Sequence, residues 1–327
     1  MDIQLIFRIF TSMANKKKSP QIVREIQNNP PEPVNYAFEK NVSYSQLSMY
    51  TQCPKKWALQ YRDGHKIREQ SIHMTFGTAL HETLQMYLDV MYNKSGAEAD
   101  RIDLEADFEE RLRNCYADAY KQNQKEHFSN ADQIREFFDD GIAIIEYIKK
   151  NRSKYFSKRG WSLVGCEVPI VLAPDPRLSR VKYMGYLDVV LYHEGTDKFV
   201  IIDIKTSTKG WGPRERKDKS KQYQLVLYKK FFAQQYNVPV SNIDIEFFIV
   251  RRKLWESQDF VIKRVQQFRP PSGKTSINRA TESLNNFLDN CFTQEGYNQK
   301  EMPCKINNNC KWCPYYKTHL CDATFKE

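Results

Sequence analysis

Two aspartates stand inside apolar, strand-like runs of the sequence. The stretch MGYLDVVLYHEGTDKFVIIDIKTS, residues 184–207, places Asp188 and Asp203 among valines and isoleucines, where a strand bound for a core normally carries no charge. Lys205 follows Asp203 by two residues and therefore shares its side of the strand. Two carboxylates and an ammonium side by side suit a site for Mg²⁺ or Mn²⁺, with the lysine placed to stabilise charge or orient water.

A hairpin would bring these residues together. If residues 194–197 form its loop, Val200 pairs with Leu191. This register places Asp188 directly across from Asp203, and directly opposed residues have Cβ atoms about 5 Å apart. The two carboxylates would repel each other unless something cationic lay between them. The alternative is a pair of edge-strand aspartates beside an ordinary exposed lysine.

The elements around the hairpin predict an α+β fold, because a helical N-terminal half precedes a mainly antiparallel sheet with one interposed helix. Apolar positions at helical spacing and serine N-cap candidates indicate the helices, and runs rich in β-branched and aromatic residues indicate the strands. The expected helices span 43–61 (broken at Pro54), 78–92, two segments within 104–150, and 221–236; the expected strands beside the hairpin are 162–172, 243–252 and 259–268.

Composition limits the classes of function. The chain has 327 residues, enough to bury a sizeable core, and a formal net charge of +10, which attracts polyanions. Solubility alone is the alternative account of that charge. No apolar run approaches the ~18 residues of a membrane span, and the N-terminus lacks the basic lead and cleavage site of a signal peptide. We therefore expect a cytoplasmic protein with no membrane association, whose native start is Met1 or Met13.

The cysteines are unevenly distributed. Of the eight, Cys304, Cys310, Cys313 and Cys321 fall close together near the C-terminus, and the others are scattered before them. In a chain without a signal peptide, a cluster of this kind more often binds metal than forms disulfides.

The order of several motifs resembles the RecB-like branch of the PD-(D/E)XK nuclease superfamily. The motifs are FGTALHETL (76–84), GYLD (185–188), IIDIKTS (201–207) and QLVLY (224–228). The resemblance covers residues 43–321. It implies a restriction-endonuclease-like core, in which a mixed, mainly antiparallel central sheet is flanked by helices, and it implies metal-dependent hydrolysis of DNA.

The resemblance assigns roles to residues within these motifs. It implies Mg²⁺ or Mn²⁺ ligands at His81, Asp188, Asp203 and the main-chain carbonyl of Ile204, a catalytic lysine at Lys205, and a supporting or DNA-contacting pair at Gln224 and Tyr228.

Some of these assignments have plain structural alternatives. Glu167 lies where relatives often carry an acidic residue and is a further candidate. His81 could be a buried, hydrogen-bonded histidine, because it stands beside an apolar helical stripe. Gln224 and Tyr228 are one helical turn apart and could simply face the edge of a core.

A second resemblance concerns the cysteines. AddB-type nucleases and CRISPR-associated RecB-like exonucleases hold a [4Fe–4S] cluster with one cysteine before the nuclease core and three after it. The resemblance implies cluster ligands at Cys53, Cys310, Cys313 and Cys321. The spacing between Cys313 and Cys321 exceeds that of the relatives, and Cys304 is a competing thiol. A structural Zn²⁺ on Cys304, Cys310, Cys313 and Cys321 is therefore the alternative.

The segment 209–222 is rich in basic residues and follows the second hairpin strand directly. Its Lys209, Arg214 and Arg216 are candidates to grip phosphates, and Trp211 is a candidate to stack on a base. A solvated loop is the alternative for each of them.

Together these observations predict four consecutive segments. They are a flexible, extended N-terminal arm (1–42), a helical region with Cys53 and His81 (43–158), a nuclease core (159–292) and a cysteine-rich segment packing back on the N-terminal helices (293–327).

The expected function is that of a DNA exonuclease acting on single strands or duplex ends in recombination, repair or replication, with a helicase or recombination protein as partner. The alternatives are a structure-selective endonuclease with the same site, and a nucleic-acid-binding subunit whose nuclease centre has lapsed and whose metal cluster is structural.

Overall fold

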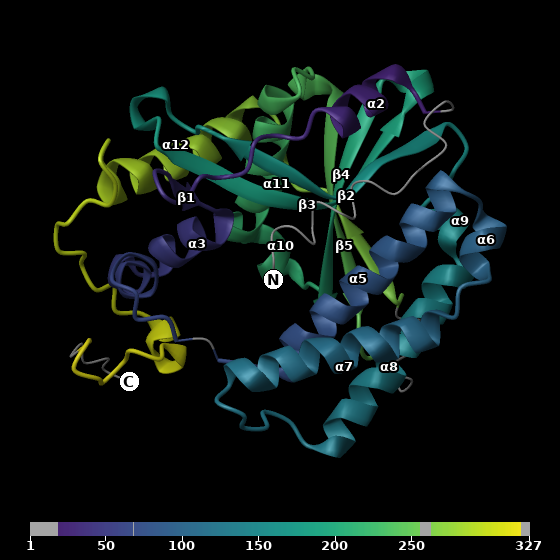
Figure 1. Cartoon of the computed structure of the whole chain (residues 1–327), viewed down its shortest axis with the longest axis horizontal. Coiled ribbons are helices and arrows are strands. Elements are labelled where there is room, and N and C mark those ends of the chain that lie inside the picture. The colour runs from purple at the N-terminus through teal and green to yellow at the C-terminus, as the bar shows by residue number, and fades with distance from the viewer. Residues whose placement is uncertain (1–18, 68, 256–262, 322–327) are drawn as a thin grey trace. The chain divides into compact units, whose positions relative to one another are not determined.

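The computed structural model describes residues 19–67, 69–255 and 263–321 (Figure 1), so neither candidate start, Met1 or Met13, lies within it. The chain forms two compact units. Unit 1 takes in Met1–Pro30, Glu69–Val168 and Tyr186–Pro271, and unit 2 takes in Pro31–Arg68, Pro169–Gly185 and Ser272–Glu327. Both units are discontinuous in sequence, whereas the sequence analysis divided the chain into consecutive segments.

Unit 1 carries most of the sheet and the long helices. Its helices are α2 (Gln21–Asn28), α5 (Ile72–Asn93), α6 (Gly96–Asp100), α7 (Leu104–Gln122), α8 (Ala131–Lys150), α9 (Arg152–Tyr155), α10 (Pro213–Lys217) and α11 (Lys219–Gln235), with short 3₁₀ turns at η3 (Glu194–Thr196) and η4 (Val240–Asn242). Its strands are β4 (Lys198–Ser207), β5 (Ile243–Arg251), β6 (Val265–Phe268) and most of β2 (Trp161–Leu172) and β3 (Val181–His193).

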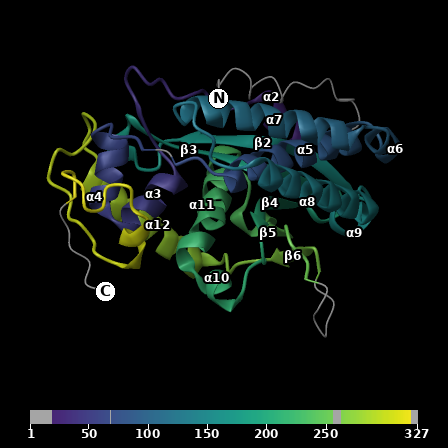
Figure 2. The same ribbon diagram turned by 90° about the horizontal axis from the view of Figure 1, so that it is seen from below.

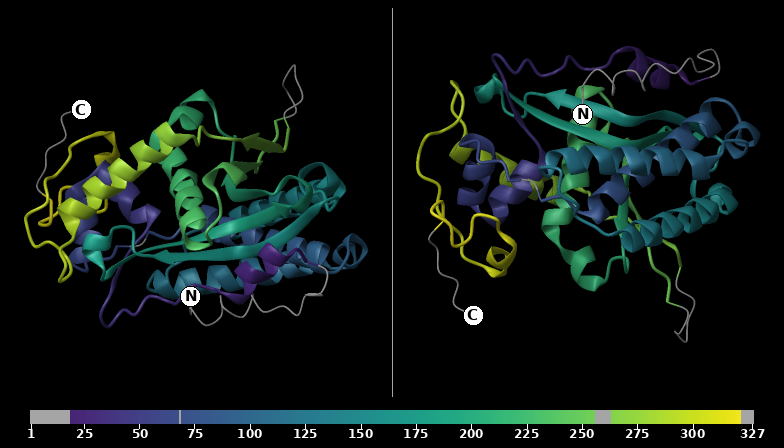
Figure 3. Two further views of the ribbon diagram at one scale, coloured as in Figure 1. Left: turned by 90° about the horizontal axis from the view of Figure 1, so that it is seen from above. Right: turned by 60° about the horizontal axis from the view of Figure 1, so that its bottom comes forward.

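The strands of unit 1 lie between two layers of helices. Helices α5, α7 and α8 cover one face and α11 lies on the other, as Figures 2 and 3 show. Along β4, Ile202 and Ile204 belong to the core beneath α5, whereas Phe199 packs against Phe232 of α11 with ring centroids 5.4 Å apart. Since alternate residues of a strand face opposite sides, Asp203 faces the α11 side.

The sheet of unit 1 is mixed. Strands β3 and β4 form the predicted antiparallel hairpin, with Leu191 opposite Val200, and β5 and β6 are also antiparallel. Strands β4 and β5 are parallel, so the sheet is mixed, as the resemblance implied. The reason is α11, which carries the chain back to the end of the sheet where β4 begins. Of the strand expected at 259–268, residues 259–262 lie outside the described part of the chain.

The helical layer forms where the sequence supplies caps and apolar stripes. The side chains of Ser71, Asp103 and Asn130 accept hydrogen bonds from main-chain N–H groups at the starts of α5, α7 and α8. Gly141 of α8 lies against the ring of Phe108 on α7, where a Cβ atom would clash. A larger residue there would separate the two helices.

The N-terminal segment differs from the expected extended arm. Residues 21–28 form α2, whose Val23 and Ile26 are buried, and the Gln27 side chain donates to the carbonyl of Val164 on β2 at 3.0 Å. The prolines at 30, 31 and 33 suggested an extended chain, but Val23 and Ile26, about one helical turn apart, determine the local structure before them.

Unit 2 is built around an aromatic cluster. Its elements are β1 (Lys40–Val42), α3 (Tyr44–Gln52), α4 (Pro54–Trp57), the π-helical turn η1 (Ala58–Arg62), η2 (Pro176–Leu178), α12 (Lys274–Cys291) and η5 (Asn308–Trp312), with the remaining parts of β2 and β3. Trp57 is fully buried and contacts Phe287 and Phe292 edge-on. The predicted break at Pro54 is confirmed, because α3 ends at Gln52 and α4 begins at the proline.

No helix within residues 19–67, 69–255 and 263–321 combines the length and the apolar character needed to cross a membrane.

Candidate active site

Strands β3 and β4 separate at Asp188. Their paired register ends with Val189 opposite Ile202. One residue further along, the main-chain N–H of Ile204 donates to Asp188 Oδ2 at 2.7 Å. The carboxylate thus takes the N–H that a strand carbonyl would otherwise receive. As a result the hairpin opens beside Asp203. The two aspartates lie close enough for the charge of Asp203 to act on Asp188, as expected from the register of the hairpin.

Asp203 and Lys205 form an ion pair on β4, in which the carboxylate is buried and the ammonium is partly exposed. Asp203 is 2% exposed, and its Oδ2 lies 2.8 Å from Lys205 Nζ. Burial raises the pKa of Asp203, while Lys205 pulls it back down. Burial alone would lower the pKa of Lys205, but the carboxylates of Asp203 and Asp188 outweigh it and leave that pKa above its ordinary value. The ammonium is therefore charged at neutral pH.

His81 approaches the aspartates from α5. Its Nδ1 lies 3.6 Å from Asp188 Oδ2. Burial, followed by the charge of Lys205, lowers the pKa of His81 to about 4, against a hydrogen bond to the main chain of Ile204. The imidazole is therefore neutral at physiological pH, which is the form that binds metals. Gly77, one turn before His81, would bring a Cβ within 3.2 Å of Thr206 Oγ1 on β4, so it permits the close approach of α5.

Glu167 adds a third carboxylate through a feature that the sequence did not reveal. It lies within β2 at φ +54°, in the left-handed region that residues other than glycine rarely adopt. The Gln85 side chain donates to Glu167 Oε1 at 2.6 Å and to the carbonyl of Asp188 at 3.1 Å. Burial raises the pKa of Glu167, and Asp203 adds to the rise. Gln85 thus joins α5 to two strands of the site.

Sequence reasoning missed Gln85, although a signal for it existed. Gln85 follows His81 by four residues, so both lie on one face of α5. It is a polar residue, buried between the apolar positions Leu84 and Leu88. A buried polar side chain needs hydrogen-bond partners, and here these partners belong to the site.

The charges of the site are unbalanced. Three carboxylates, those of Glu167, Asp188 and Asp203, act on one another, and Lys205 supplies the cation. Burial raises the pKa of Asp188 well above its ordinary value, and Asp203 raises it further. A hard divalent cation would offset the remaining negative charge.

The donor set fits such a cation, because it combines carboxylate oxygens with a neutral imidazole. Asp203 Oδ2 is buried and accepts no well-aligned hydrogen bond besides its ion pair. As the side chains stand, however, no three His, Cys, Asp or Glu residues in the described part of the chain form a ready-made metal site. Binding would require these side chains to adjust.

The other predicted residues of the site come from α11. Tyr228 is buried, and Gln224 hydrogen-bonds to it. Burial raises the pKa of Tyr228, and the charges of Asp203 and Asp188 raise it further. Tyr228 therefore stays a neutral phenol that is hydrogen-bonded to Gln224 and lies within the influence of the charges of the acidic site.

The basic segment after β4 lies partly in α10. Arg214 and Arg216 are exposed on this short helix, and Lys209 Nζ lies 5.6 Å from the ring centroid of Trp255. Trp211 packs on Phe247 with ring centroids 4.8 Å apart.

Main-chain contacts also hold Trp211, because its N–H and carbonyl both bond to the Gln266 side chain. Lys221 Nζ lies 5.1 Å from its ring centroid. Trp211 thus anchors the segment to the sheet, a role that the sequence did not suggest.

Comparison with known proteins shows the family of this chain. The family model for the PD-(D/E)XK nuclease superfamily matches residues 41–321. The chain belongs to this superfamily. The matched residues include every member of the acidic site and all the cysteines near the C-terminus.

Other comparisons add little to this membership. No curated protein matches the sequence. Among solved structures, a protein from Eubacterium rectale named "Putative exonuclease" is similar, with 13% sequence identity, coverage of 89% of this chain and 91% of that chain, and a TM-score of 0.43. A likeness this distant carries no argument about activity.

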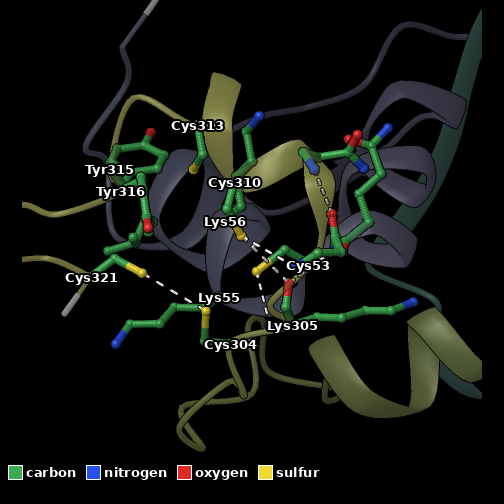
Figure 4. Close-up of a pocket in the computed structure, with 14 residues that line it drawn as sticks. Cys53, Lys55, Lys56, Cys304, Lys305, Cys310, Cys313, Tyr315, Tyr316 and Cys321 are labelled. Atoms are coloured by element: carbon green, nitrogen blue, oxygen red, sulfur yellow. Dashed lines mark hydrogen bonds between the residues drawn. The ribbon is translucent and has the colours of Figure 1, made fainter. Parts of the chain in front are cut away.

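The protein also has a pocket lined by cysteines, which lies within unit 2. Figure 4 shows the sulfur atoms of five cysteines around it: Cys53, Cys304, Cys310, Cys313 and Cys321. The Sγ atoms of Cys304 and Cys321 are 3.8 Å apart. Cys304, the competing thiol of the sequence analysis, therefore lies among the four cysteines expected to hold a cluster.

Main-chain N–H groups point at two of these thiols. Lys305 N lies 3.4 Å from Cys53 Sγ, and Asn307 N lies 3.4 Å from Cys310 Sγ. Such donors would stabilise a thiolate. The described cysteines nevertheless are not arranged as a formed metal site.

Proposed function

We propose that the protein is a metal-dependent nuclease that hydrolyses phosphodiester bonds of DNA, acting as an exonuclease on single strands or duplex ends. The observation that carries the proposal is the meeting of Asp188, Asp203 and Lys205 at the open end of the hairpin, with a neutral His81 beside them. Membership of the nuclease superfamily supports the same chemistry.

A divalent cation would be held by His81, Asp188, Asp203 and the carbonyl of Ile204, with Glu167 next to them. Such an ion lowers the pKa of bound water and polarises the phosphate. The residues of the chain would do the rest. Lys205 places a positive charge where the phosphate gathers negative charge in the transition state, and Gln85 holds Glu167 and the backbone of Asp188 in position.

The substrate would reach this site across exposed basic groups. Lys209, Arg214 and Arg216 follow β4 directly, and cationic side chains there would contact phosphates of the DNA. Trp211 supports this segment from beneath, through its packing on Phe247.

For unit 2 we propose a [4Fe–4S] cluster on Cys53, Cys310, Cys313 and Cys321. The N–H donors toward Cys53 and Cys310 support this set. The contact of Cys304 with Cys321 favours the alternative, a zinc ion on Cys304, Cys310, Cys313 and Cys321. Absorbance at about 400 nm accompanies an iron–sulfur cluster and not zinc, so anaerobic purification followed by metal analysis separates the two.

The test of the nuclease is Asp203→Asn. We expect it to lower the Mg²⁺- or Mn²⁺-dependent degradation of end-labelled single-stranded DNA by at least ~10³-fold. Asp139→Asn, an exposed aspartate on α8, is the matched control and should degrade DNA like the parent protein. Degradation by Asp203→Asn at the parent rate would refute this site, whereas an inactive parent protein would favour the non-catalytic binding subunit.

The same assay separates exonuclease from endonuclease. Circular single-stranded DNA has no end, so an exonuclease leaves it intact. Cleavage of the circle would establish the structure-selective endonuclease. The partner that we propose, a helicase or recombination protein, would be one that supplies such ends.

A further inference from the structure

The surface around the cysteine pocket carries charge of one sign. Residues 52–61 and 302–321, which supply most of the pocket, contain five lysines and no aspartate or glutamate. Lys55, Lys56 and Lys305 line the pocket (Figure 4). Among the described residues, none of these three forms an ion pair with a carboxylate; Lys305 Nζ donates to the carbonyl of Thr51 at 3.1 Å. Like charges held together without counter-charges attract a polyanion.

The chain next to the pocket exposes an indole. Trp312 is 82% exposed, more than any other large hydrophobic side chain in the described part of the chain. It lies in η5, between Cys310 and Cys313, and both of these cysteines line the pocket. Trp57 of the same unit is fully buried in the aromatic cluster, so Trp312 makes no comparable contribution to the core.

The pairing of lysines with an exposed ring narrows the choice of polyanion. Lysines contact phosphates, and an exposed aromatic ring gives a base a face on which to stack. In a duplex the bases already stack on each other, so the ring favours a single strand. An acidic peptide would use the lysines and leave the indole without a stacking partner.

We propose that Lys55, Lys56, Lys305 and Trp312 form a single-strand binding surface on unit 2, separate from the residues of the acidic site. The lysines bind phosphates and the indole stacks on a base. The inference rests on the proposed function, because it takes the strand to be the nuclease's substrate. It places a second contact with the nucleic-acid strand in unit 2, which contains the cysteine pocket.

The test is binding without hydrolysis. The full chain carrying Asp203→Asn, without added Mg²⁺, is titrated into fluorescein-labelled oligothymidine at several salt concentrations. In that background Trp312→Ala should weaken binding ~10-fold, because one stacked base is lost. Trp312→Phe should recover most of the affinity, since phenylalanine keeps an aromatic face. Phe38→Ala is the matched control, because Phe38 is 72% exposed in the same unit.

For the lysines, the expected change is in the salt dependence of binding. Lys55→Gln combined with Lys56→Gln should lower the slope of log Kd against log salt by about 1.4, at ~0.7 per phosphate contact on a single strand. Lys125→Gln, an exposed lysine in unit 1, should leave the slope as it is. Unchanged thermal melting and unchanged metal content would show that the variants are folded.

The outcomes separate this inference from the nuclease proposal. If Trp312→Ala and the double lysine variant bind oligothymidine like their background, the single-strand surface is refuted even when the parent protein degrades DNA. If polyglutamate, or vesicles of phosphatidylserine and phosphatidylcholine, lose affinity on Trp312→Ala while oligothymidine does not, the surface binds a peptide or a membrane and the inference fails. A parent protein that binds through these residues and hydrolyses nothing supports the surface and refutes the nuclease.

Discussion

The acidic site of unit 1 and the cysteine pocket of unit 2 differ in how they are held. In the acidic site, hydrogen bonds from the sheet and from α5 hold two of the three carboxylates: Ile204 N–H holds Asp188, and Gln85 holds Glu167. In the cysteine pocket, the cysteines belong to loops and to short helical turns. The thiols of Cys304 and Cys321 contact each other. The sheet and α5 thus support the acidic side chains before any ion binds, whereas thiols on loops would depend more on a metal for their final geometry.

The largest effect should come from Lys205→Met. The substitution removes the ammonium that stands among three carboxylates, so we expect hydrolysis to fall by ~10³-fold. Thermal melting in Mn²⁺ should stay within a few degrees of the parent protein, because the hydrogen bonds of the sheet remain. Lys198→Met, at the other end of β4, is the control for both readouts. Hydrolysis at the parent rate would show that the lysine has no role in the chemistry.

The corresponding change in unit 2 is Cys310→Ser. If a metal sets the geometry of the pocket, the variant should lose bound metal and the absorbance at about 400 nm, and it should melt at a lower temperature than the parent protein. Cys115→Ser, on α7 in unit 1, should keep both properties. Full metal content in Cys310→Ser would mean that Cys304 replaces it or that Cys310 is not a ligand.

Gln85→Leu tests whether the acidic site is held by its supporting hydrogen bonds. The variant leaves Glu167 and the Asp188 carbonyl without their donor, and such supporting contacts typically contribute ~10- to 100-fold to metal affinity or activity. We expect Mn²⁺ binding, followed by calorimetry, to weaken within that range. Gln133→Leu, an exposed glutamine on α8, serves as the control. An unchanged affinity would mean that Glu167 needs no support.

The smallest effect should be a dependence of stability on pH. Burial raises the pKa of Glu167, Asp188 and Asp203, so in the folded protein these three groups keep protons above pH ~4, where they ionise in the unfolded chain. Their contribution to stability without metal should therefore fall as the pH rises through the raised pKa values, and Mn²⁺ should restore it. The lowered pKa of His81 acts in the opposite direction below its ordinary value, so the fall should be clearest above pH ~6.5. Melting temperatures between pH 4.5 and 8 in chelator would show the slope, and Asp203→Asn should flatten it.

Sequence reasoning could predict much of the site, because much of it is local. The loop length and the alternation of apolar residues fixed the register that brings Asp188 to Asp203, and the i, i+2 spacing placed Lys205 beside them. The break at Pro54 followed from the missing N–H of proline. Parallel pairing of β4 and β5 did not follow, because it depends on where α11 returns the chain.

By itself, the amino-acid sequence determined which residues share a strand face or a helix face, since sterics and backbone hydrogen bonding set those periods within a few residues. Only the tertiary structure decided which faces meet. It placed Gln85 against Glu167, packed Trp211 onto the sheet and left Trp312 in solvent. The physical reason is that burial and hydrogen bonding between distant segments depend on contacts that no local pattern encodes.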